Sequence, residues 1–537
     1  MADIWQDVLG IDRIGVTDNF FALGGDSIKG IQMASRLQQH GWKLEMKDLF
    51  QHPTIGELSA YVQAADDQPI DQNPVEGEVT LTPIQRWFFE RKFTNEHHWN
   101  QSVMLHAPSG FDPEAAGKAL TKMIEHHDAL RMVYQRNGNG IVQYNRGLEE
   151  TAVRPEVIRF NESGAELEAA VLKESNRIQS SINLTEGPLL KAAIFETDQG
   201  DHLLIVIHHL VVDGISWRIL LEDFAAGYAQ AEKGEPIILQ EKTHSFAEYA
   251  ARLKEYARSK AFAKEIGYWQ EVEKAETASL PKDDEAEDKR MHHTKTAEFS
   301  LSKEETEQLM TKVHEAYNTE MNDILLTALG LALKEWTGQE DFIICLEGHG
   351  REDIMEGLNI SRTVGWFTSQ FPALIQLRHS EDIGYQIKQI KEELRHIPNK
   401  GIGYGIYRYL TEEGKKAQPI KHDISFNYLG QFAEMADSGL FTRSALPSGD
   451  PLSPETEKPN ALDIVGYIEN GILTMSIAYH SLEYKESTVA AVAASFKTYL
   501  LQLIDHCLEL DGGELTPSDL GDDELTLEEL DKLMEIF

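Results

Sequence analysis

Two adjacent histidines form the pattern in this chain that is best suited to moving protons. They lie in the segment Ile207–Gly214, which reads IHHLVVDG. Histidine titrates near neutral pH, so it can accept or release a proton during a reaction. The apolar run predicts a strand that ends in a turn, and strand alternation would send His208 and His209 to opposite faces. Asp213 could then orient a histidine or form a structural ion pair.

Three interpretations of the pair stay open on these residues alone. Both rings could be buried and hydrogen-bonded in the core. A metal site would need a spaced third ligand or a helical H-E-x-x-H pattern, and the sequence offers neither, so we expect no metal. The third interpretation is that one histidine acts as a general base.

A glutamate is the second group with an acid/base pattern. Glu347 follows the buried-strand pattern Phe342–Leu346 and precedes glycines that let the backbone approach closely. A carboxylate that faces a pocket has a raised pKa, which makes it a better proton donor. The alternative is a surface-loop carboxylate paired with Arg351. Tyr428, at the end of another strand pattern, could donate a hydrogen bond or pack in the core.

A serine near the N-terminus is placed to carry an anion. Ser27 follows Gly24-Gly25-Asp26 and precedes the helical pattern Ile28–Gln39. The glycines let the backbone turn, and Ser27 suits the N-cap of the helix. The dipole and the free N–H groups of a helix N-terminus favour a phosphate on such a serine. The alternative is a plain capping serine.

The elements that must hold these residues divide the chain into parts. Residues 1–66 are predicted to be a small all-α four-helix bundle, and the polar stretch 67–78 a linker. From residue 79 the pattern is mixed α/β, and the charged segment Lys274–His293 predicts two lobes, residues 79–285 and 286–510. Strand-like runs lie at Ser102–His106, Leu190–Glu196, His202–Ile207, Phe342–Leu346, Asp423–Tyr428 and Leu473–Ala478. Long helices are expected at Pro113–His127, Trp217–Ala231, Ser302–Ala316, Asn322–Trp336 and Glu486–Cys507.

Charge and composition exclude several classes of function. Lys plus Arg total 50 and Asp plus Glu total 89, a net charge of −39 that repels nucleic acid and anionic lipid. No apolar run approaches the roughly 20 residues that a membrane span needs, so no membrane partner is expected. The 2 cysteines are far apart and form no disulfide framework, which predicts a cytoplasmic location.

The last stretch, residues 511–537, is strongly acidic. It contains one helical pattern, which begins at the capping box Thr526–Glu529. Leu527, Leu530, Leu533, Met534 and Phe537 form an apolar stripe. This helix could pack back on the body or bind a groove on another protein.

Residues 1–66 resemble the acyl and peptidyl carrier domains. The resemblance rests on Asp18-Asn19-Phe20-Phe21 followed by Gly24-Gly25-Asp26-Ser27-Ile28. It implies that Ser27 holds a covalent 4′-phosphopantetheine arm, installed by a phosphopantetheinyl transferase. Asp26 before the serine is similar to the form found in carriers upstream of epimerization domains.

The rest of the chain resembles the epimerization version of the condensation-type domains of nonribosomal peptide synthetases. Seven segments carry the resemblance: Leu81–Phe88, Ser216–Leu220, Asn322–Leu326, Glu347–Glu352, Arg362–Thr368, Gly401–Gly405 and Phe426–Gln431. The resemblance implies a two-lobed α/β fold of the chloramphenicol-acetyltransferase-like condensation superfamily, with the site between the lobes.

The resemblance also implies site residues and a reaction. His209 would face the channel as a base, with His208 and Asp213 as structural support. Inverting a Cα centre requires removing a proton on one face and adding one on the other, and Glu347 would be the second group. The enolate oxygen of the thioester needs a donor, for which Tyr428 or Asn427 is the candidate. The implied enzyme is an isomerase that converts L to D at Cα of an aminoacyl or peptidyl thioester, in antibiotic biosynthesis.

Partners follow from the same resemblance. An upstream adenylation domain would load the carrier, and tail 511–537 would dock a downstream condensation domain on a separate subunit. Similarity to initiation subunits implies phenylalanine as substrate, as in an ATP-dependent phenylalanine racemase. The alternatives are a peptide-bond-forming condensation domain and a non-catalytic carrier and docking scaffold.

Overall fold

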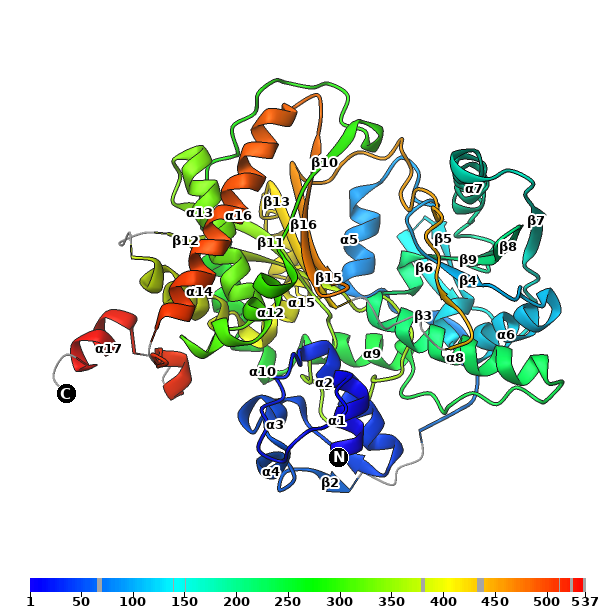
Figure 1. Ribbon diagram of the computed structural model, residues 1–537, viewed down its shortest axis with the longest axis horizontal. Helices are drawn as coiled ribbons and strands as arrows, with labels where there is room; N and C mark the ends of the chain where they lie inside the picture. Colours follow the sequence, from blue (N-terminus) through cyan, green and yellow to red (C-terminus); the bar gives the residue numbers. More distant parts are fainter. Residues whose placement is uncertain are drawn as a thin grey trace.

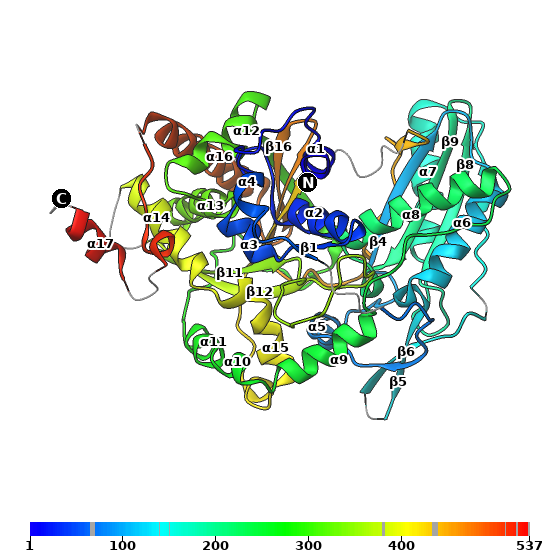
Figure 2. The ribbon, with the colours of Figure 1, turned by 90° about the horizontal axis from the view of Figure 1, so that it is seen from below.

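Three bodies follow one another along the chain in the computed structural model: a small N-terminal unit and two α/β lobes. Figure 1 shows the N-terminal unit, in blue, beneath the junction of the lobes, and Figure 2 shows the same unit from below. The structure describes residues 1–64, 70–138, 140–149, 151–377, 382–431, 439–510, 512–521 and 525–534.

The N-terminal unit is built from short helices around a small apolar core. Its helices are α1 (Ala2–Leu9), α2 (Ser27–Gln39), α3 (Met46–Gln51) and α4 (Ile55–Leu58). Trp5, Phe20 and Met33 are among the side chains buried between them. The last of these helices, α4, ends at Leu58, and the chain then continues into β2 (Gln63–Ala64), which pairs with β1 (Trp42–Lys43).

The cap of α2 differs from the prediction. Asp26, not Ser27, is the N-cap residue: its carboxylate accepts a hydrogen bond from the backbone N–H of Lys29 at 2.7 Å, and Ser27 is the first residue of the helix. Aspartate caps as well as serine does, so either residue could serve, and local backbone geometry decides.

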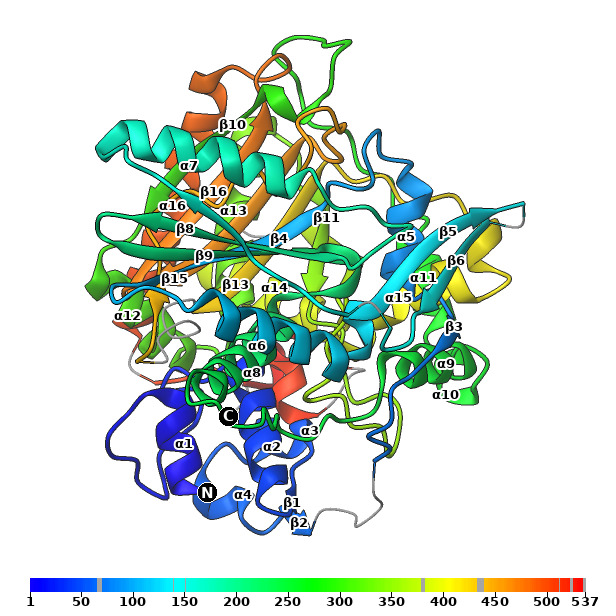
Figure 3. The same ribbon diagram turned by 90° about the vertical axis from the view of Figure 1, so that its right-hand side faces the viewer.

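The first lobe contains a five-stranded sheet of order β14-β4-β9-β8-β7. Figure 3 shows α7 above this sheet and α6 and α8 below it. The strands are β4 (Asn100–Ala107), β7 (Glu156–Arg159), β8 (Leu190–Thr197), β9 (Gly200–His208) and β14 (Thr442–Arg443), and the helices are α6 (Pro113–His126), α7 (Gly164–Gln179) and α8 (Gly214–Glu232). Strand β14 comes from the chain segment predicted for the other lobe. A small sheet of β3 (Gly77–Val79), β5 (Met132–Asn137) and β6 (Gly140–Asn145) lies beside it.

The second lobe contains a six-stranded mixed sheet of order β10-β16-β15-β13-β11-β12. Its strands are β10 (Thr294–Ser300), β11 (Asp341–Gly348), β12 (Ser369–Gln376), β13 (Ile424–Gln431), β15 (Leu462–Glu469) and β16 (Ile472–His480). Helices α12 (Lys303–Met310), α13 (Met321–Thr337), α14 (Ile383–Arg395) and α16 (Glu486–Glu509) cover it on one side (Figure 1). Helices α5 (Pro83–Arg91), α9 (Phe246–Tyr256), α11 (Ile266–Val272) and α15 (Ile402–Leu410) lie on the other side (Figure 2).

Helix α16 corrects one expectation. By length and composition alone it could cross a membrane, although no such segment was expected from the sequence. In the fold its apolar residues, Val489, Phe496 and Leu503 among them, are buried against α13 and β10.

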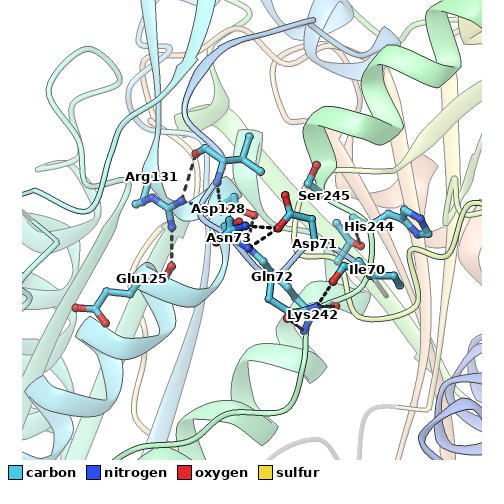
Figure 4. A network of polar contacts seen from close by, with 12 residues as sticks. Ile70, Asp71, Gln72, Asn73, Glu125, Asp128, Arg131, Lys242, His244 and Ser245 are labelled. Carbon is cyan, nitrogen blue, oxygen red and sulfur yellow. Dashed lines mark hydrogen bonds and ion pairs between the residues drawn. The ribbon is translucent and has the colours of Figure 1, made fainter. Parts of the chain in front are cut away.

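The linker is held in place over its second half. Residues 67–69 of the predicted linker lie outside the described residues, but from Ile70 onward the chain meets a buried polar network (Figure 4). Asp128 accepts from the N–H of Val75 at 2.9 Å, from Arg131 at 2.7 Å and from Lys242 at 2.9 Å. The three charged side chains are only 5 %, 1 % and 8 % exposed, so each depends on the others for compensation.

The acidic tail is divided. Residues 512–521, with the short helix η7 (Pro517–Leu520), pack on α14, where Lys391 pairs with Asp519 at 2.7 Å. Helix α17 (Leu527–Met534) follows at the edge of the molecule (Figure 1). Leu527 and Leu530 of the predicted stripe are buried and Leu533 is exposed, whereas Phe537 lies outside the described residues.

Candidate active site

The two histidines have different surroundings. Strand β9 ends at His208, and His209 begins a 3₁₀ turn. His208 is fully buried, donates from Nε2 to the Glu96 carbonyl at 2.9 Å and accepts from the N–H of Leu210 at 3.1 Å. Burial lowers the pKa of His208 to about 3. Both ring nitrogens are therefore occupied, and His208 is a neutral structural group.

His209 is only partly buried and faces another direction. Its Nδ1 donates to the Val212 carbonyl at 2.7 Å, and its ring lies on the Trp366 indole with the centroids 4.4 Å apart. Its Nε2 lies 3.1 Å from the amide nitrogen of Gln101. Burial lowers the pKa of His209. A neutral imidazole with Nε2 free of a proton is the form that a general base requires.

Asp213 joins the lobes and makes no hydrogen bond to His209. Its carboxylate caps α8 at the N–H of Ser216, 2.7 Å away, and accepts from the N–H of Phe367 at 3.1 Å. Arg351 of the second lobe approaches the same carboxylate at 3.2 Å. Of the two roles open for Asp213, the structure shows the ion pair.

Glu347 lies between two amide donors because of the strand order. On β11 it faces Gln370 of β12 directly, and on the other side β13 places Asn427 next to it. Gln370 donates to one carboxylate oxygen at 3.0 Å and Asn427 to the other at 2.6 Å. Burial raises the pKa of Glu347, and the two amides oppose that rise. Since Arg351 is paired with Asp213, the alternative pairing of Glu347 with Arg351 is wrong.

One segment links the two groups. Trp366 packs on His209, and Gln370, four residues later, binds Glu347. Four residues span at most about 14 Å, so both groups meet the same short stretch of chain from different lobes. Trp366, Gln370 and Gln101 were not singled out in the sequence, because their roles come from tertiary contacts that no local pattern encodes.

Tyr428 lies closer to the N-terminal unit. Its ring lies against Gly466, where an added Cβ would be 3.4 Å from it. Burial raises the pKa of Tyr428, and the charge of Asp26 adds to the rise. Asn427 is engaged with Glu347. Neither contact tests the predicted role as donor to an enolate, which stays a prediction.

The start of α2 meets both lobes. Lys29 donates to Gln431 at 2.9 Å, and a Cβ on Gly430 would lie 3.2 Å from the Asp26 carboxylate. On the first lobe, the Arg218 guanidinium on α8 contacts the amide of Gln32. Ser27 is thus placed at the junction of the lobes, at the end of the strand that carries Tyr428 and Asn427.

Two clusters among the described residues have side chains that could ligate a metal, and both have other partners. His126, His127 and Asp223 form one, in which Asp223 is paired with Arg362 at 2.8 Å. Asp288, His292 and His293 form the other, in which Asp288 is paired with Arg290. Neither contains His209 or Glu347.

Comparisons with known proteins identify the families that the two parts of the chain match. Residues 75–526 match the condensation-domain family, and residues 1–62 match the phosphopantetheine attachment site family. Over the whole chain, surfactin synthase subunit 1 of Bacillus subtilis (strain 168) is 67 % identical and gramicidin S synthase 1 of Brevibacillus brevis is 48 % identical. This chain spans 15 % of the first and 50 % of the second.

One solved structure is similar to most of this chain. The epimerization domain from the third module of tyrocidine synthetase B is 48 % identical, with a TM-score of 0.78. The similarity covers 82 % of this chain and 100 % of that domain.

Proposed function

Since this chain belongs to the condensation-domain family of the nonribosomal peptide synthetases and carries a phosphopantetheine attachment domain, we propose that it epimerizes a carrier-bound thioester. The predicted resemblance to the nonribosomal peptide synthetases is confirmed. The finer claim is that the reaction inverts Cα of an aminoacyl or peptidyl group from L to D. One observation carries it: a histidine and a carboxylate, on different lobes, converge on one segment of chain.

His209 and Glu347 divide the proton transfers. His209 Nε2 takes the Cα proton on one face, while Nδ1 stays bonded to the Val212 carbonyl, which stabilises the imidazolium that forms. Glu347, whose pKa burial raises, delivers a proton to the opposite face when it is in its protonated form. Exchange with solvent then restores both groups, and the reverse assignment of acid and base serves the D to L direction.

The attachment domain carries covalent 4′-phosphopantetheine, and the surroundings of Ser27 fit that group. Ser27 begins a 13-residue helix, whose N-terminus favours a phosphate, and the half-buried cation Arg218, which contacts Gln32 of the same helix, also interacts with the charge of Asp26 at the N-cap. The thiol of the arm would form the thioester with the aminoacyl or peptidyl group, and the carbonyl of that group would then acidify the Cα proton. Gly430 of β13 lies against Asp26, the neighbour of Ser27, and Asn427, three residues or roughly 10 Å earlier on the same strand, donates to Glu347. Strand β13 therefore connects the region of Ser27 with Glu347.

Condensation and a silent scaffold remain the competing functions. Peptide-bond formation needs no second acid/base group, so the paired amides that hold Glu347 favour epimerization. A scaffold would not need a half-buried histidine with its Nδ1 proton fixed.

The proposal is tested by loading Ser27 with an L-aminoacyl-pantetheine and resolving the enantiomers released over time. Accumulation of the D form supports it. A product that stays L in the folded, loaded protein contradicts it, and dipeptide formed with a second loaded carrier would instead favour condensation.

Other parts of the proposal concern partners. An adenylation domain would load the arm that a phosphopantetheinyl transferase installs, and the tail would dock a condensation domain of a separate subunit. Because residues 512–521 pack on the second lobe, we assign that docking to α17 alone. Phenylalanine as substrate and a cytoplasmic location stay predictions.

A further inference from the structure

Gln101 connects His209 to a buried tryptophan. Gln101 lies on β4, opposite Ile207 of β9, two residues before His209. The indole Nε1–H of Trp217, in the first turn of α8, donates to the Gln101 side-chain oxygen at 2.9 Å. The Gln101 amide nitrogen lies 3.1 Å from His209 Nε2. The three side chains thus form a chain of contacts from the core to the base.

The direction of each hydrogen bond in this chain is determined by chemistry. An indole N–H can only donate, so Gln101 must present its oxygen to Trp217. Its NH₂ group then faces His209, and two N–H groups cannot pair, so His209 Nε2 accepts. The Val212 carbonyl can only accept, so the imidazole proton lies on Nδ1. The donors and acceptors of Trp217, Gln101 and His209 are therefore all assigned.

We infer that Gln101 is a positioning residue that, oriented by Trp217, holds His209 with its proton on Nδ1 and with Nε2 unprotonated, the form in which His209 acts as the base. The inference rests on the proposed function and deepens it. At 3.1 Å the amide contact is near the upper end of the hydrogen-bond range, so a substrate hydrogen can displace it.

The other groups around His209 do not supply this control. Trp366 packs against the ring face and offers no acceptor or donor in the ring plane. Asp213 is the charged group that acts on the pKa of His209, and it is paired with Arg351. Val212 fixes one nitrogen, and Gln101 is the contact at the other.

The test observes the tautomer in the resting holo-protein, without turnover. Nitrogen-15 NMR of histidine-labelled protein, with the His209 signals assigned by His209→Gln, should show Nδ1 protonated and Nε2 unprotonated. In Gln101→Glu the new carboxylate accepts from both Trp217 and His209. We therefore expect a proton on Nε2 and a His209 titration midpoint shifted to higher pH.

Two further variants separate positioning from packing. Gln101→Leu should slow Cα exchange about 10- to 100-fold in the folded protein, and it should also lower the unfolding midpoint because the buried Trp217 N–H loses its acceptor. Trp217→Phe should weaken the tautomer preference in the wild type and add nothing in the Gln101→Leu background. Gln135→Leu, an exposed glutamine of β5, is the matched control and should change neither property.

The outcomes distinguish the two claims. If Gln101→Glu leaves the tautomer and the midpoint of His209 unchanged, Gln101 does not position His209. If the wild type shows the expected tautomer but exchanges no Cα hydrogen, the epimerase function fails and the positioning of His209 stands.

Discussion

The two lobes hold their acid/base groups in opposite ways. On the first lobe, His209 donates from one nitrogen to a backbone carbonyl and presents the other nitrogen to a single amide. On the second lobe, Glu347 receives one amide donor on each oxygen. Burial lowers the pKa of His209 and raises that of Glu347, so the same physical cause shifts the two pKa values in opposite directions.

The largest expected effect removes one member of the pair. His209→Gln and Glu347→Gln should each slow epimerization by about 10²- to 10⁴-fold, the usual contribution of a general acid or base. Because the groups serve opposite faces, each variant should retain Cα exchange from only one enantiomer of the loaded thioester. Deuterium uptake measured separately from L- and D-loaded carrier checks this. Residual exchange from the same enantiomer in both variants would place the two groups on one face.

The contact that joins the lobes should be the next most sensitive. Asp213→Ala leaves Arg351 buried without its carboxylate, so we expect the free energy of unfolding to fall by about 3–5 kcal/mol. Glu469→Ala, which breaks the exposed pair with Arg443, should cost no more than about 1 kcal/mol. Denaturant unfolding of both variants measures the difference. Equal losses would mean that Asp213 does not hold the lobes together.

His208, unlike its neighbour His209, should affect how the stability of the fold depends on pH. Its pKa of about 3 in the folded protein lies below the roughly 6.5 expected in the unfolded chain. The unfolded state therefore binds more protons between these values, and stability falls as pH drops below about 6.5. One such group contributes about 1.4 kcal/mol per pH unit in this window. His208→Asn should flatten the dependence of unfolding free energy on pH, and an unchanged slope would contradict the assignment.

The smallest effect concerns the amides around Glu347. Gln370 lowers the pKa of Glu347, so Gln370→Leu should raise it further. In a bell-shaped rate profile one limb should then move to higher pH, by less than a unit for one neutral hydrogen bond. The titration midpoint of His209, followed by NMR, should stay where it is. A shift of the His209 midpoint would show that the two sites are not separately controlled.

The sequence predicts where the two candidate acid/base groups lie in the fold better than it predicts what holds them. His209 and Glu347 each follow an apolar strand pattern, and the strands β9 and β11 end close to where that pattern ends. Gln101, Trp366 and Gln370 were missed, because their contacts join strands and loops that are far apart in the chain. The packing of the first part of the tail on α14 was not predicted for the same reason. The sequence does not distinguish Asp519 from the other acidic residues of the tail, and its pairing with Lys391 comes only from the tertiary fold.

The central claim is tested most directly by Cα exchange in the loaded wild-type protein in D₂O. The account predicts that L- and D-loaded carriers both take up one deuterium at Cα and approach the same L/D mixture. It also predicts that His209→Gln and Glu347→Gln each slow deuterium uptake from a different enantiomer. A folded, loaded protein that takes up no deuterium from either enantiomer would contradict it.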